Sequence, residues 1–158
     1  MAMEIRIVYE TNSGGTYLVA TYMAEILIAK GFIVQVKKAS EVSEDYLFFD
    51  GLTILGSPSW DFSNGEGKRF EGYPHEMMYD LINCEVVREN TNQKFACFGL
   101  GDHDYTFFSG AVDHLEKYVE KVGGVKVGES LRIGEFYFDK DKNLERVENW
   151  VVNLVERL

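Results

Sequence analysis

The chain has 158 residues, which is long enough to bury a full hydrophobic core. Hydrophobic residues make up 46% of it and aromatic residues 14%, and it has only two prolines, so its composition is not that of a disordered chain. Its formal net charge of −10 excludes nucleic acid and anionic membrane as partners, and would repel further copies of the chain while attracting basic proteins. No apolar run reaches transmembrane length, and Cys84 and Cys97 form no CxxC pair. We therefore expect one domain over residues 1–158, in a cytoplasmic monomer with reduced cysteines.

The first elements of the chain follow one another closely. Glu4–Tyr9 is an apolar run typical of a strand, and Gly15–Lys30 carries apolar side chains at helical spacing. Gly31 suits the position after a helix, and Phe32–Val36 is predicted to be the second strand. The segment 39–50 is predicted to be an irregular connection with at most a short helical turn.

Strands and helices also alternate through the rest of the chain. In order, the sequence predicts a short buried strand at Leu52–Gly56, a long loop at Ser57–Pro74, a helix at His75–Val87, a strand at Lys94–Leu100, a helix at Phe107–Val122, a strand at Val125–Ile133 bent at Gly128, and a last helix carrying Leu144, Val147, Val151, Leu154 and Leu158. This alternation predicts an α/β fold, doubly wound, with helices on both faces of a five-stranded parallel sheet. Ligands of such sheets bind beyond the carboxyl ends of the strands.

The turn after the first strand has the composition of a phosphate site. It consists of Thr11, Asn12, Ser13, Gly14, Gly15 and Thr16. Free N–H groups at a helix start attract an anion, glycines let the backbone approach it, and the hydroxyls add donors. The loop has no lysine and is neither a P-loop nor a G-x-G-x-x-G motif. The alternative is a capped helix after a tight turn, in which the hydroxyls serve only the backbone.

Aromatic residues follow the two neighbouring strands. Trp60 lies in the stretch Ser57–Phe62, and Tyr105 lies in the stretch Gly99–Tyr105. Two aromatic side chains at adjacent loops can enclose a flat ring by stacking. Trp60 alone could equally fold into the core or lie on the surface. Together with the first loop, however, all three stretches are expected to meet at one edge of the sheet.

These stretches resemble the loops of the flavodoxin family. Residues 11–16 look like its phosphate loop, [ST]-x-[ST]-G-x-[ST], and Ser57–Trp60 resembles its second flavin loop. Ala96–Asp102, followed by Tyr105 and Phe108, resembles the third. The resemblance covers essentially the whole chain and matches the short-chain form. It implies the strand order known for flavodoxins, 2-1-3-4-5, with FMN at the switch point of the sheet.

The resemblance also implies a cofactor and a function. FMN would be bound non-covalently, with the phosphate on residues 11–16 and the ring between Trp60 and Tyr105. The cofactor-binding residues implied in this way are Thr11, Asn12, Ser13, Gly14, Gly15, Thr16, Pro58, Ser59, Trp60, Asp61, Phe62, Leu100, Gly101, Asp102, Tyr105, Phe107 and Ser109. The protein would be a low-potential one-electron carrier between a reductase-type donor and an oxidoreductase acceptor, rather than an enzyme with its own substrate.

The chain departs from the family pattern at Asp61, where flavodoxins often have a glycine, and in residues 62–73, which are several residues longer than usual. The runner-up is an FMN-dependent NAD(P)H:quinone reductase of similar fold. A phosphoacceptor receiver domain fits less well, because only Glu10 follows the first strand and the third strand ends without an aspartate. The histidines His75, His103 and His114 show no metal-ligand spacing.

Overall fold

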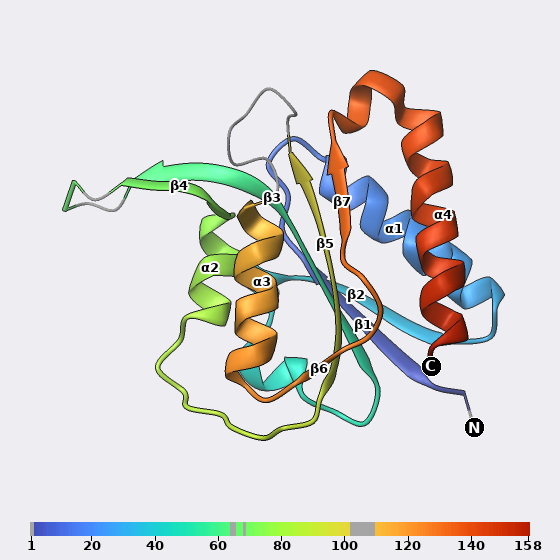
Figure 1. Ribbon diagram of the computed structural model, residues 1–158, viewed down its shortest axis with the longest axis horizontal. Helices are drawn as coiled ribbons and strands as arrows, with labels where there is room; N and C mark the ends of the chain where they lie inside the picture. Colours follow the sequence, from blue (N-terminus) through green and yellow to red (C-terminus); the bar gives the residue numbers. More distant parts are fainter. Residues whose placement is uncertain (1, 64–65, 68, 102–109) are drawn as a thin grey trace.

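The computed structural model describes residues 2–63, 66–67, 69–101 and 110–158. It shows a parallel sheet between two pairs of helices (Figure 1). The strands of the parallel sheet are, in spatial order, β2 (Ile33–Lys38), β1 (Glu4–Tyr9), β3 (Leu52–Ser63), β5 (Lys94–Gly101), and then β6 (Val125–Lys126) and β7 (Leu131–Gly134), which both pair with β5. With β6 and β7 as the two halves of the predicted fifth strand, the expected order 2-1-3-4-5 is confirmed. The bend falls at Gly128, whose φ is +70°.

Helices cover both faces of the sheet, as expected. Helices α1 (Gly15–Ala29) and α4 (Lys140–Glu156) pack against each other on one face, and α2 (Glu76–Ile82) and α3 (Gly110–Lys121) lie on the other (Figure 1). None of the helices in the described part of the chain is long and apolar enough to cross a membrane.

The strands divide their side chains between two apolar cores because successive residues of a strand point to opposite faces. In β1, Ile5 and Ile7 enter the core beneath α1 and α4, while Val8 enters the core beneath α2 and α3. In β5, Phe98 enters the core beneath α1 and α4, and Phe95 enters the core beneath α2 and α3. Burial on both faces explains why β5 is almost entirely apolar and why β1 is apolar apart from Glu4 and Arg6.

The prediction of a loop at residues 57–74 is wrong, because most of these residues form a β-hairpin. Strand β3 continues to Ser63 and pairs antiparallel with β4 (Arg69–Pro74), and Figure 1 shows this hairpin extending beyond α2. Pro58 falls where β3 changes partners, since it is the last residue paired with β5 and Ser59 is the first paired with β4. A proline that lacks a ladder N–H is tolerated at such a point, so it did not end the strand.

Other boundaries shift by smaller amounts. Helix α2 ends at Ile82 rather than Val87, with Asn83, a residue of low helix propensity, as its C-cap. The connection after β2 contains two 3₁₀ turns, η1 (Ala39–Glu41) and η2 (Glu44–Leu47). A third 3₁₀ turn, η3 (Phe136–Asp139), precedes α4 and was not predicted from the sequence.

Candidate functional site

A cavity of about 530 Å³ lies at the carboxyl ends of β1 and β5, beside the point where β3 leaves β5, and is within the usual size range for ligand pockets. Its lining residues are Asn12, Ser13, Gly15, Thr16, Pro58, Ser59, Trp60, Leu100, Gly101, Glu135, Phe136, Tyr137 and Phe138. The structure thus brings residues from all three stretches singled out in the sequence to one edge of the sheet. None of these lining residues is a lysine or arginine.

The loop 11–16 leads into α1, and the N-terminal end of this helix is open to a ligand. Gly14 is the N-cap, with φ +90° and ψ −11°, and within the described residues no side chain caps the helix. The Gly14 N–H instead donates to Thr11 Oγ1 at 2.9 Å. The N–H groups of the next residues have no acceptor within the helix, and the first turn holds no acidic residue. This end of α1 can therefore accept an anion.

Two small residues let this loop sit close to the cavity wall. A Cβ on Gly15 would lie 3.0 Å from Leu100 Cδ2, so a larger residue there would have to displace the wall. Thr16 is only 2% exposed and lines the cavity. Asn12 and Ser13 are exposed at its rim.

The Trp60 ring belongs to a wall that the hairpin and α2 build together. Trp60 pairs with Tyr73 of β4, and its indole stacks on the His75 imidazole at 6.4 Å between ring centroids and 23° between planes. His75 is itself fixed, because its N–H donates to Ser57 Oγ at 2.9 Å and its Nδ1 accepts the Met77 N–H at the start of α2. Trp60 is therefore half-buried in a strand at the cavity, and not on a free loop tip.

Ser59 and Glu10 have structural contacts that the sequence did not predict. Ser59 Oγ accepts the Ala111 N–H at 3.1 Å, which ties β3 to the first turn of α3. The Glu10 carboxylate is buried and accepts the Ser40 N–H at 3.0 Å, at the first 3₁₀ turn after β2.

Several predicted site residues cannot be placed in the same way. Asp102, Tyr105, Phe107 and Ser109 lie outside the described residues. Asp61 and Phe62 belong to β3, but their side chains are not described. Across from Asp61 the hairpin has a bulge, because Trp60 pairs with Tyr73 while Phe62 pairs with Phe70. The bulge accommodates one extra residue of β4 and coincides with the φ of +67° at Gly72.

The segment after β7 also belongs to the site, although its residues were not predicted to do so. Glu135, Phe136, Tyr137 and Phe138 line the cavity opposite the hairpin. The signal was present, since three consecutive aromatic residues follow the end of a predicted strand. This is the same pattern that drew attention to Trp60.

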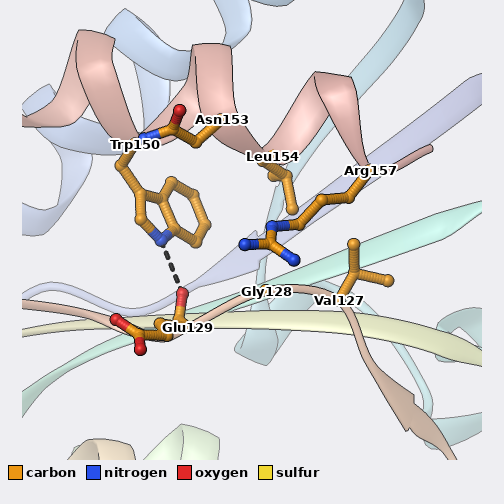
Figure 2. A pocket seen from close by; sticks show the side chains of 7 residues that line it. All are labelled: Val127, Gly128, Glu129, Trp150, Asn153, Leu154 and Arg157. Atoms are coloured by element: carbon orange, nitrogen blue, oxygen red, sulfur yellow. Dashed lines mark hydrogen bonds between the residues drawn. The ribbon is translucent and has the colours of Figure 1, made fainter.

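A second cavity, of about 260 Å³, lies between the β6–β7 bend and α4 (Figure 2). Trp150 closes one side and donates its indole N–H to the Glu129 carbonyl at 2.7 Å. Arg157 lies over Gly128 on the other side (Figure 2). This cavity adjoins β6, which pairs with the first residues of β5, so it is remote from the carboxyl edge where such sheets bind ligands.

Comparison with known proteins agrees with this geometry. A family model for flavodoxins matches residues 7–150. A flavodoxin of Maridesulfovibrio salexigens is 32% identical over 157 residues, covering 96% of this chain and 97% of that protein. A probable flavodoxin 2 of Bacillus subtilis is 32% identical over 131 residues, covering 82% of this chain and 81% of that protein. Oxidised flavodoxin 2 from Bacillus cereus has a similar fold, with a TM-score of 0.77 at 24% identity over 98% of this chain and 99% of that one.

Proposed function

This chain belongs to the flavodoxin family of FMN-dependent electron carriers, and we propose that the cavity at the carboxyl edge of its sheet is the FMN site. The observation that carries the proposal is the uncapped start of α1, which opens into the cavity that Trp60 also lines. Bound FMN supplies the one-electron redox chemistry, and the protein supplies binding and electrostatics.

The residues present suit the two ends of FMN. The N–H groups at the start of α1 and the hydroxyls of Thr11, Ser13 and Thr16 would hold the phosphate. Gly15 lets this loop lie close to the cavity wall, because a Cβ there would be 3.0 Å from Leu100 Cδ2. The Trp60 indole, backed by His75, would form one wall beside the flavin ring.

The charge distribution supports a low potential. None of the described lining residues is a cation, and the one charged residue among them, Glu135, is an acid. With a net charge of −10, the chain raises the free energy of added negative charge in the site. A bound group that gains negative charge on reduction is therefore harder to reduce here than in water.

Redox proteins are the partners of a flavodoxin, and we propose that those of this chain present a basic face. We also propose that the chain works as a cytoplasmic monomer, on the grounds of its charge and its two separate cysteines. Stopped-flow electron transfer from a basic reductase should slow as salt rises, because exposed charges are screened within about 10 Å at 0.1 M. Rates that do not change with ionic strength would contradict an electrostatic docking face.

The flavin site itself is tested by titrating the flavin-free protein with FMN and with riboflavin. Flavin fluorescence should be quenched at much lower concentrations of FMN, since riboflavin lacks the phosphate. Equal affinities would remove the role proposed for the start of α1. Rapid NADH or NADPH oxidation with a quinone, without added reductase, would favour the reductase alternative.

A further inference from the structure

The segment after β7 is held firmly against the end of β5. Glu135 has a φ of +52° and donates its N–H to the Gly101 carbonyl at 2.7 Å. Phe136 is buried, and the Asn143 side-chain amide donates to its carbonyl at 3.1 Å. These contacts fix the backbone beside Tyr137, from which its half-exposed side chain extends.

Tyr137 extends from this segment to the loop 11–16. Its hydroxyl donates to the Ser13 carbonyl oxygen at 3.1 Å. On the other side of the same peptide unit, the Gly14 N–H donates to Thr11 Oγ1 at 2.9 Å. The Ser13–Gly14 peptide is thus held at both its oxygen and its nitrogen.

This peptide unit controls how α1 begins. Gly14 is the N-cap, and its carbonyl accepts the Leu18 N–H at 3.0 Å, which is the first bond of the helix. A rotation of the Ser13–Gly14 peptide would reorient Gly14 and, with it, the N–H groups of the first turn. A loop that already has its binding conformation loses less conformational entropy when the ligand arrives.

We propose that Tyr137 is a positioning residue that holds the loop 11–16 in its anion-binding conformation, and so raises the affinity for a flavin that carries a phosphate over one that does not. The inference rests on the proposed FMN site. A tyrosine that acted only as a wall for the flavin would affect FMN and riboflavin equally, because both carry the same ring.

The test compares Tyr137→Phe with Tyr22→Phe. Phenylalanine keeps the ring at 137 and removes only the hydroxyl. Tyr22 is a matched control, since its hydroxyl also joins α1 to the C-terminal part of the chain, through Glu148 Oε2 at 3.4 Å, but at residues that do not line the cavity. Dissociation constants for FMN and riboflavin are measured by flavin fluorescence on flavin-free protein, and amide hydrogen exchange is measured on the same samples.

In Tyr137→Phe we expect the Kd for FMN to rise about fivefold and that for riboflavin by less than about twofold. Amide exchange in residues 11–16 of the flavin-free protein should become about fivefold faster, with the rest of the chain unchanged. Tyr22→Phe should change neither of the two dissociation constants, nor the amide exchange in residues 11–16. An unchanged FMN Kd, an equal rise for both flavins, or faster exchange across the whole chain would overturn the inference.

Failure of the FMN site would look different from failure of this inference. If the unmodified protein showed no preference for FMN over riboflavin, the proposed site would be wrong. Exchange in residues 11–16 would still decide whether the Tyr137 hydroxyl holds the loop. If the unmodified protein prefers FMN and Tyr137→Phe retains the full preference, only the role of Tyr137 fails.

Discussion

Gly14→Ala tests whether the left-handed start of α1 is required for flavin binding. Gly14 has a φ of +90°, which costs a residue with a Cβ about 1–2 kcal/mol. The added Cβ would meet Tyr137 Oη at 3.4 Å, which is an ordinary contact, so backbone strain is the main cost. A loop that relaxes to relieve the strain moves the N–H groups of the first turn. Losing one hydrogen bond to a charged group costs about 1.5–3 kcal/mol, so FMN affinity should fall about ten- to a hundredfold.

Gly31→Ala is the matched control at the other end of the same helix. Gly31 has a φ of +97°, and a Cβ there would meet nothing within 4 Å. Both variants should lower the thermal midpoint of the flavin-free protein by about 2–8 °C, the size expected for this strain in a chain of this length. Only Gly14→Ala should weaken FMN binding in a fluorescence titration. If Gly14→Ala binds FMN as tightly as Gly31→Ala does, the conformation at Gly14 is not what prepares the phosphate site.

Further predictions concern single side chains. Thr16→Val should weaken FMN binding about tenfold or more while leaving riboflavin binding nearly unchanged, as a paired titration would show. Burial, reinforced by Lys117, lowers the pKa of His114, so the fold favours the neutral imidazole. The contribution of His114 to stability is complete above about pH 6.5 and is lost as the pH falls through the lowered pKa. In His114→Phe, the thermal midpoint of unfolding should therefore depend less on pH across that range. Glu44→Ala should lower the free energy of unfolding by about 1–3 kcal/mol in urea titrations, since it removes the carboxylate that Arg88 Nε contacts at 2.7 Å and leaves the buried Tyr118 hydroxyl without the acceptor it reaches at 2.8 Å, while Asp45 still pairs with Arg88.

The strands and the first helix were predictable because their signals are local. The mostly apolar stretches Glu4–Tyr9 and Lys94–Leu100 match β1 and β5 closely, since strands buried on both faces need apolar side chains at most positions. Gly31 ends α1 as expected. Its N–H donates to the Ile28 carbonyl and the Phe32 N–H donates to the Leu27 carbonyl, which is the Schellman pattern.

The hairpin was not predictable in the same way because its stability depends on distant contacts. Glycines and Pro58 within 57–74 favoured a loop by composition. The strands are nevertheless fixed at their base, where the Gly72 backbone packs on the start of α3 so closely that a Cβ on Gly110 would lie 2.1 Å from the Gly72 carbonyl oxygen. The bulge at Gly72 lets β4 keep its register despite the extra residue.

The two ends of the candidate site therefore differ in how far a short stretch of sequence determines their structure. At the phosphate end, Thr11, Gly14 and the start of α1 are neighbours in the chain, so their residue types alone indicated an anion site, and only the contact from Tyr137 was missing. At the ring end, Trp60 obtains its position from pairing with Tyr73 and stacking on His75, which lie 13 and 15 residues away. A tryptophan held in a paired strand has less freedom than one on a loop tip, so this wall keeps its shape before a flavin binds.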